Sequence, residues 1–293
     1  MSQADTSHPV VESFFHAETG SWTHVVHDGE TAAVIDPVLD YDAAAARTST
    51  ASADAVLAFL RDRRLRVAWI LETHAHADHL SAAGHLHDAL HAPAAIGRGI
   101  VAVQAYFKEL FGLDDSFAAD GSQFDRLLDG GDTLAVGSLE VRAIATPGHT
   151  RDGLTYLVGD TAFIGDTLFA PDVGTARCDF PGGDAAELHG SIRRILSLPK
   201  SARLFLCHDY PPKGRDAPMP ETSVAAEAQG NGWIAGVDEP TFVGRRRTRD
   251  ATLPVPRLLL TALQVNIRGG RLPPPESDGS SYLRIPLNRF GRV

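Results

Sequence analysis

The sequence predicts an α/β fold with a polar site at the carboxyl ends of several strands. Short apolar runs alternate with segments of helical periodicity along the chain. Clusters of histidine and aspartate come directly after four of the predicted strands, where α/β folds place their sites. With 43% hydrophobic residues in 293, the chain can also bury a sizeable core. We expect one domain over residues 1–212 and an extension, 213–293, that packs on the same domain.

The first part of the chain predicts three strands and a helix. Residues 10–15, 23–27 and 32–36 are β-like, and Asp28-Gly29 is a hairpin signal between the last two. Asp36 precedes a proline, so it either initiates a turn or orients a ligand histidine from behind. Residues 40–52 predict a surface insertion, and a helix follows over 53–63 with Ser52 and Asp54 as its capping residues.

The stretch Glu72-Thr-His-Ala-His-Ala-Asp-His79 is the centre of the predicted site. It follows an apolar strand at 67–71, and an extended backbone would turn His74, His76 and Asp78 to one side. Helical periodicity predicts that His79 opens a helix running to Leu90. Imidazoles and carboxylates are the usual ligands of zinc and iron, so this crowding predicts a metal site.

The later elements carry three further polar clusters. We expect a strand at 94–96, a helix at 101–111, an acidic turn-rich segment at 114–131, and a helix at 184–198. Strands are expected at 133–136, 139–145, 154–158, 162–164 and 203–206. His149, Asp166 and the pair His208 and Tyr210 each follow one of these strands. Residues 221–293 are Pro-rich and predicted irregular. The basic run 244–249 is predicted to be a solvated helix face, with steering of an anionic substrate as the alternative.

Composition excludes several function classes. The formal net charge of −10 argues against nucleic acid as a partner, because phosphate contacts require a basic surface. The sequence shows no membrane-spanning stretch and no leader, so we expect a cytoplasmic protein. Cys178 and Cys207 are too few for a disulfide framework and are expected to be small buried residues. A homodimer is compatible with the sequence, which does not reveal the oligomeric state.

The motif set resembles the metallo-β-lactamase superfamily over about residues 10–212. The carrying residues are His74-x-His76-x-Asp78-His79, His149 in Thr-Pro-Gly-His, Asp166 in Gly-Asp-Thr, and His208. The resemblance implies an αβ/βα four-layer sandwich with a metal site along one edge, followed by an irregular C-terminal arm. Because this superfamily hosts several chemistries, the fold alone does not determine the reaction.

Further segments resemble the persulfide dioxygenase branch of this superfamily. They are residues 72–79, 166–183, 208–210 and 253–266. Thr175-Ala176 and Cys178 depart from the pattern of that branch. The resemblance implies oxidation of glutathione persulfide, or a similar thiol persulfide, to sulfite with dioxygen. It implies one Fe(II) per chain on His74, His149 and Asp166.

The same resemblance implies roles for the remaining residues of the site. His76, Asp78, His79 and His208 would surround the metal as hydrogen-bonding residues. Tyr210 would contact the bound sulfur or oxygen, or else be a buried tyrosine with a satisfied hydroxyl. Arg177 would bind a carboxylate of the substrate, or else pair with Asp179 or Asp172. The alternative function is a dinuclear zinc hydrolase of a thioester, lactone or β-lactam, as in glyoxalase II, with two Zn ions on the full ligand set.

Overall fold

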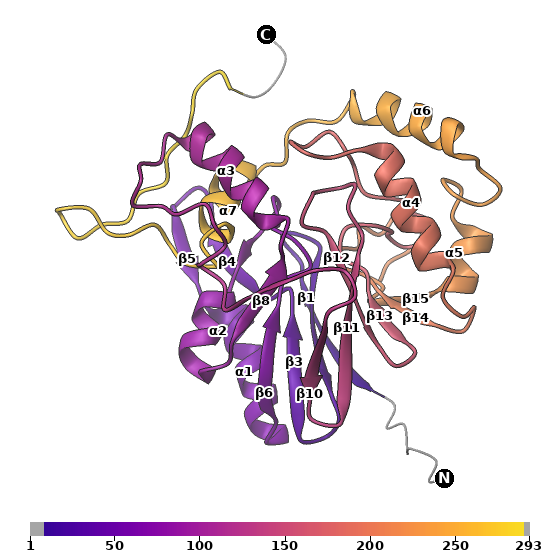
Figure 1. The fold of residues 1–293 in the computed structure, drawn as a ribbon, viewed down its shortest axis with the longest axis horizontal. Coiled ribbons are helices and arrows are strands. Elements are labelled where there is room, and N and C mark those ends of the chain that lie inside the picture. The colour runs from indigo at the N-terminus through magenta and orange to yellow at the C-terminus, as the bar shows by residue number, and fades with distance from the viewer. Residues whose placement is uncertain (1–8, 290–293) are drawn as a thin grey trace.

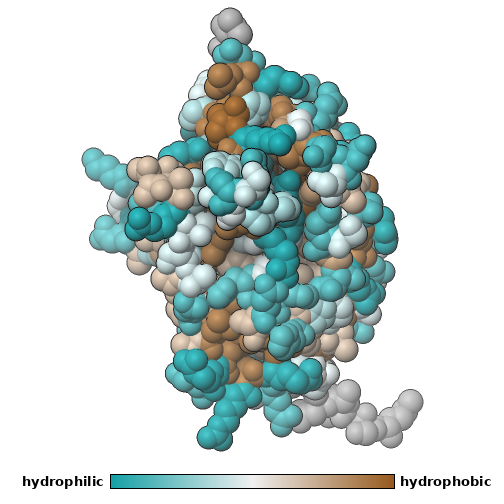
Figure 2. Space-filling model, turned by 90° about the vertical axis from the view of Figure 1, so that its left-hand side faces the viewer, coloured by the Kyte–Doolittle hydropathy of each residue, from teal (hydrophilic) through white to brown (hydrophobic). Residues whose placement is uncertain are grey.

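The computed structural model describes residues 9–289 and contains two packed β-sheets between two layers of helices (Figure 1). The four-layer sandwich is therefore confirmed. None of the helices in the described part of the chain is long and apolar enough to cross a membrane. The face on the side of α1 to α3 carries mostly hydrophilic side chains, with small apolar areas between them (Figure 2).

The first sheet has six strands and is covered by four helices. Its order is β1 (Val10–His16), β2 (Ser21–His27), β3 (Thr31–Ile35), β6 (Arg66–Leu71), β8 (Ala94–Gly97) and β9 (Arg126–Leu128). From β3 to β9 neighbouring strands run parallel, so their carboxyl ends share one edge. The helices are α1 (Ala51–Arg63), α2 (Ala83–Leu90), α3 (Ile100–Phe111) and α7 (Leu259–Asn266), whose apolar faces join one core cluster with this sheet.

The second sheet also has six strands, and three helices cover it. Its order is β10 (Thr133–Val136), β11 (Leu139–Ala145), β12 (Leu154–Val158), β13 (Thr161–Phe163), β14 (Arg203–Phe205) and β15 (Glu221–Ser223). The helices are α4 (Ala185–Leu196), α5 (Val224–Gly230) and α6 (Glu239–Asp250). Asp184 caps α4 by accepting hydrogen bonds from the amides of Ala186 and Glu187. Tyr156 and Phe163 belong to the core between the two sheets.

Two predictions from the N-terminal region are wrong, and a third lacked detail. Residues 40–52 lie largely at the surface, as predicted, and β4 (Val38–Asp42) and β5 (Arg47–Ser49) form a hairpin there. Ser52 does not cap α1, since its hydroxyl donates to Asp40 instead, at 2.7 Å. The helix after the ligand stretch begins at Ala83 rather than His79, because β7 (Leu80–Ser81) first pairs with β4.

Two predictions from the later part of the chain also need correction. The segment 114–131 contains β9, which pairs in parallel with β8 and which local composition did not reveal. Residues 221–293 are not irregular throughout, because β15, α5, α6 and α7 lie within 221–266. Between 221 and 289, residues 231–238, 251–258 and 267–289 lie outside helices and strands. The extension thus supplies a strand to the second sheet and a helix to the outer layer of the first.

Candidate metal centre

The ligand-bearing loops leave both sheets at their carboxyl ends. The segment 72–79, called the ligand loop below, follows β6, while His149 follows β11, Asp166 follows β13 and His208 follows β14. Since β13 and β14 are parallel neighbours, their terminal residues emerge side by side. The turn before His149 requires glycine: Gly148 has φ of +133°, and a Cβ there would lie 2.2 Å from the Leu188 amide nitrogen.

The structure brings the seven predicted metal-site residues together as two groups. In each group the potential ligand atoms lie within 4.8 Å of one another. We call them the three-donor group (His74, His149 and Asp166) and the four-donor group (His76, Asp78, His79 and His208). Asp166 faces both groups, because its Oδ2 lies 3.6 Å from His149 Nε2 and its Oδ1 lies 3.3 Å from His208 Nε2.

Hydrogen bonds determine which ring nitrogen is free in the three-donor group. His149 donates from Nδ1 to the carbonyl of Arg177 at 2.7 Å, which leaves the lone pair on Nε2. Thr73 uses its hydroxyl proton on Asp36, so it accepts from His74 Nδ1 at 3.1 Å. His74 Nε2 therefore also carries a lone pair, and it lies 4.0 Å from Asp166 Oδ2.

The four-donor group is held differently. His79 donates from Nδ1 to the Leu80 carbonyl at 3.1 Å, so its Nε2 is free. His208 Nε2 lies 3.3 Å from Asp78 and equally close to Asp166. His76 turns its Nε2 toward Asp36 at 3.1 Å and Glu72 at 3.5 Å. Asp36 thus contacts a candidate ligand from behind, which favours the orienting role over a turn-initiating one.

The protonation of the cluster follows from burial and neighbouring charge. Burial and the adjacent imidazoles hold the pKa of His74 well below its usual value, and they lower the pKa of His79 to about 3. Burial also opposes charge on His208, but the carboxylates of Asp166 and Asp78 outweigh it and raise the pKa well above the usual value. Asp36 has the same effect on the pKa of His76.

The buried polar atoms of the cluster fit a metal ion. Among the described residues, thirteen side-chain atoms with negligible exposure have no hydrogen-bond partner, and eight of them belong to this cluster: His74 Nε2, both ring nitrogens of His76 and of His208, His79 Nε2, Asp78 Oδ2 and Asp166 Oδ1. Leaving so many buried polar atoms unsatisfied is costly, and a coordinated cation removes that cost. All eight atoms belong to predicted site residues, so the donor set matches the chemistry of zinc or iron.

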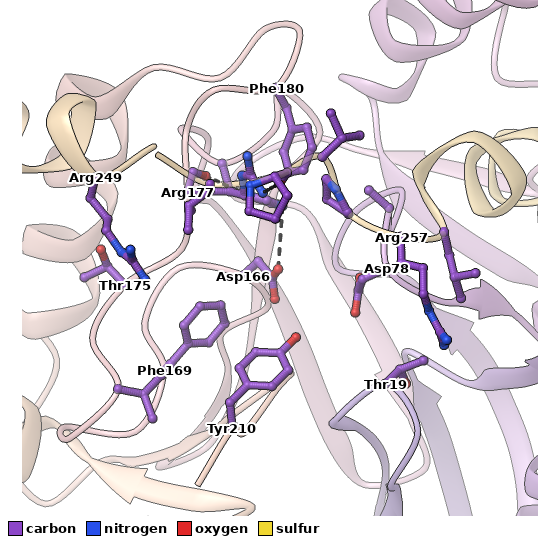
Figure 3. A pocket seen from close by; sticks show the side chains of 18 of the residues that line it. Thr19, Asp78, Asp166, Phe169, Thr175, Arg177, Phe180, Tyr210, Arg249 and Arg257 are labelled. Atoms are coloured by element: carbon purple, nitrogen blue, oxygen red, sulfur yellow. Dashed lines mark hydrogen bonds and ion pairs between the residues drawn. The ribbon is translucent and has the colours of Figure 1, made fainter. Parts of the chain in front are cut away.

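A pocket of about 860 Å³ opens onto the cluster. Asp78, His149, Asp166 and Tyr210 line it, and in Figure 3 the carboxylates of Asp78 and Asp166 and the hydroxyl of Tyr210 gather around one space. Tyr210 is 48% exposed and its ring is parallel to that of His208, with centroids 5.8 Å apart. Its hydroxyl has no hydrogen-bond partner among the described residues. The alternative prediction, a buried tyrosine with a hydrogen-bonded hydroxyl, is therefore wrong.

Four arginines line this pocket, and two of them are already saturated. Arg177 donates twice to Asp179, at 2.6 and 2.8 Å, and once to the Pro254 carbonyl at 2.7 Å. The bond to Pro254 holds residues 253–258 beside the pocket. The ion pair with Asp179 is the alternative that the sequence predicted. Arg246 is 4% exposed and bonded to Asp250 and Thr175, so the prediction of a solvated helix face is wrong for this residue.

The other two arginines are less engaged, and the sequence predicted neither of them as a substrate-binding residue, although a steering role was the alternative for the run that contains Arg249. Arg249 makes one long hydrogen bond, 3.4 Å to Thr252, and Arg257 has no partner within the described chain. Figure 3 shows them on opposite sides of the pocket. A basic run in an acidic chain was the available signal for Arg249, whereas no local pattern distinguished Arg257.

Two further buried residues support the ligand loop from outside the motifs. Asp152 accepts from the amide of Ala75 at 2.7 Å. Asn266 donates to the carbonyls of His76 and His79, both at 2.8 Å. No sequence signal could have found them, because each reaches the loop from a distant part of the chain.

The chain belongs to the metallo-beta-lactamase superfamily, whose family model matches residues 17–208. A probable metallo-hydrolase from Burkholderia pseudomallei is 52% identical over 95% of this chain and 99% of its own length. A beta-lactamase hydrolase-like protein from Xylella fastidiosa is 50% identical over 96% of this chain, which spans only 65% of that protein. The mitochondrial persulfide dioxygenase ETHE1 of Bos taurus is 29% identical over 69% of this chain and 68% of its own.

A solved structure supports the same placement. The crystal structure of ETHE1 from Myxococcus xanthus matches with a TM-score of 0.71 and 29% identity, and the match covers 89% of this chain and all of that one. The predicted likeness to the persulfide dioxygenase branch is therefore confirmed as a likeness. The choice between dioxygenase and hydrolase depends on the site itself.

Proposed function

We propose that this chain is a persulfide dioxygenase, using one Fe(II) held by His74, His149 and Asp166. The observation that carries the proposal is the three-donor group itself, which is separate from His76. Two histidines and one carboxylate with open positions are typical of non-haem iron oxygenases. In a dinuclear hydrolase all seven residues would be metal ligands, but here His76 Nε2 lies 3.1 Å from Asp36.

The proposed reaction is RSSH + O₂ + H₂O → RSH + SO₃²⁻ + 2 H⁺. Both dioxygen atoms and the water oxygen end on the terminal sulfur, which is oxidised while dioxygen is reduced. Fe(II), when bound, would bring sulfur and dioxygen together and relay electrons from the sulfur to dioxygen. The protein supplies binding, orientation and proton handling around that centre.

The pocket residues have distinct tasks in this proposal. Arg249 and Arg257 bind anionic groups on the thiol carrier, and their placement on opposite sides suits a carrier such as glutathione with two carboxylates. Tyr210 donates a hydrogen bond from its hydroxyl to the reacting sulfur. His208 Nε2 lies between Asp78 and Asp166 and orients these two carboxylates. Phe169, Phe180 and Trp233 give the pocket apolar walls that limit water.

A second function, hydrolysis by two metal ions, is favoured by one specific observation. Asp166 presents one oxygen to each group, as a carboxylate bridging two ions does. The high identity to a probable metallo-hydrolase supports the same alternative. Its substrate would be a thioester, lactone or β-lactam, and both groups would hold zinc.

Metal analysis and two activity assays separate these functions. We expect protein purified without added metal to contain one iron per chain, measured by elemental mass spectrometry. Oxygen uptake with glutathione persulfide should yield sulfite, whereas hydrolysis of S-lactoylglutathione should remain at background. Two zincs per chain together with thioester hydrolysis would overturn the proposal in favour of the hydrolase.

A further inference from the structure

We propose that Asn266, the last residue of α7, is a positioning residue for the metal centre. It lies in the C-terminal extension, yet its side-chain amide donates to the carbonyls of His76 and His79. Its carbonyl oxygen accepts from the amide of Ser81 at 2.8 Å. One side chain thus joins both ends of the His76–His79 segment to the C-terminal helix.

The physical need for such a residue comes from the backbone of the ligand loop. This loop is neither helix nor strand between Glu72 and His79. Only its first two residues bond to neighbouring strands, Glu72 to Ala95 and Thr73 to Leu154, among the backbone bonds of the described chain, so the later peptide groups need other partners. Asn266 is 4% exposed and satisfies two carbonyls and one amide there. Losing a buried partner costs about 1–3 kcal/mol for each group left unsatisfied. The loop would therefore shift or open if this amide were removed.

The position of Asn266 is itself constrained by close packing. Gly270 follows α7 with φ of +76°, and a Cβ there would lie 2.8 Å from both the Gly84 nitrogen and the Ser81 carbonyl oxygen. Gln104 of α3 donates to the carbonyl of Ile267 at 2.9 Å. These contacts press the end of α7 against the ligand loop, so the Asn266 amide has little freedom to move away.

Within the described chain, three other side chains anchor the backbone of the ligand loop, and all three act nearer its start. Tyr156 donates from its hydroxyl to the Glu72 carbonyl at 2.7 Å. Asp36 accepts from the Thr73 amide at 2.7 Å, and Asp152 accepts from the Ala75 amide. The half that carries Asp78 and His79 depends on Asn266. Partners of this kind behind a ligand typically change metal affinity 10- to 100-fold when removed. Retention of the metal therefore depends on the C-terminal helix, whichever metal binds and whichever reaction follows.

The test compares Asn266→Ala and Asn266→Asp with Gln264→Ala in the full-length, metal-loaded protein. Gln264 is a matched control, because it is equally buried on α7 but bonds to Leu260 and Arg284 rather than to the ligand loop. We expect both Asn266 variants to lose metal to EDTA about tenfold faster than wild type. Hydrogen–deuterium exchange should rise in peptides covering residues 72–82 and stay unchanged in peptides covering 139–150.

Asn266→Asp keeps the test decisive if the alanine variant does not fold. It preserves size and an acceptor for the Ser81 amide, but it removes both donors and places a carboxylate beside two carbonyls. Gln264→Ala should raise exchange only around residues 271–289. Metal loss within twofold of wild type in a folded Asn266 variant would overturn the proposal, as would equal acceleration by Gln264→Ala. Neither result concerns the substrate, so failure here is distinguishable from failure of the proposed function.

Discussion

The three-donor and four-donor groups share Asp166 but are held by different parts of the molecule. In the three-donor group both imidazoles donate from Nδ1 to fixed oxygens, so both Nε2 lone pairs are aimed inward. In the four-donor group only His79 has such a partner. His208 lies between two carboxylates, and its pKa is well above the usual value despite burial. These differences support our proposal that the first group supplies the metal ligands and the second supplies hydrogen-bonding residues.

The difference explains why a mononuclear site would retain seven ligand-type residues. His76 Nε2 lies 3.1 Å from Asp36, and His208 Nε2 lies 3.3 Å from Asp78 and from Asp166, so both rings can orient these carboxylates without binding the metal. In a dinuclear centre the same two rings would have to be unprotonated at the nitrogens that bind the metal ions. The mutations below distinguish these two states of the cluster.

The largest expected effect comes from His149→Ala in the three-donor group. Removing this ligand should abolish iron retention and lower turnover by about 1,000-fold or more, because the bound metal lowers the activation free energy by several kcal/mol. Iron content and oxygen uptake measure the two losses. His189→Ala is the control, since this histidine pairs with Glu239 on the outer helices. Iron content equal to wild type in a folded His149→Ala protein would contradict the ligand assignment.

His79→Ala in the four-donor group should have a smaller effect. We expect turnover to fall about 10- to 100-fold while one iron per chain remains, because a hydrogen-bonding neighbour is lost rather than a ligand. Elemental analysis and oxygen uptake on the same preparation check this prediction. Loss of one of two zincs, with activity as low as in His149→Ala, would instead identify the four-donor group as a second metal site.

The sequence predicted the three-donor group because each ligand lies in a local motif at a strand end. His74, His149 and Asp166 are far apart along the chain, yet strand order brings them together, and the resemblance supplied that order. The sandwich was predicted for the same reason. Its strands are short and apolar, and their pairing follows the family pattern.

The supports of the site could not be predicted because they depend on long-range contacts. Asn266 reaches the ligand loop from the far end of the chain, and nothing near it marks this role. Arg246 and Arg249 belong to one basic run, but α6 turns the first into the protein and the second into the pocket. Composition alone gave both residues the same expectation. Helix α7 was missed because the prolines before and after it obscured its short apolar run.

Arg249→Gln and Arg257→Gln should weaken substrate binding without touching the metal. Each charge-assisted hydrogen bond to a carboxylate contributes about 1.5–3 kcal/mol, so we expect KM for glutathione persulfide to rise about tenfold with kcat nearly unchanged. Cysteine persulfide has only one carboxylate, so its KM should rise in only one of the two variants. Arg245→Gln on the same helix is the control, because Arg245 lines a neighbouring groove instead. A fall in kcat with constant KM would show that these arginines act on the reaction rather than on the carrier.

The smallest effect is expected from Cys207→Ser, although this thiol adjoins both groups. Cys207 is 2% exposed and its Sγ lies 3.6 Å from Asp36 Oδ2, a contact that a serine hydroxyl can replace. Burial raises the pKa of the thiol, so it is not a thiolate and is a poor nucleophile or sulfur carrier. We therefore expect turnover within about threefold of wild type, since buried thiols act mainly by packing. Steady-state oxygen uptake checks this, with Cys178→Ser as the matched control. A loss of turnover as large as that of His79→Ala, at unchanged iron content, would contradict this prediction. It would show that Cys207, which lies between the two groups, takes part in the reaction.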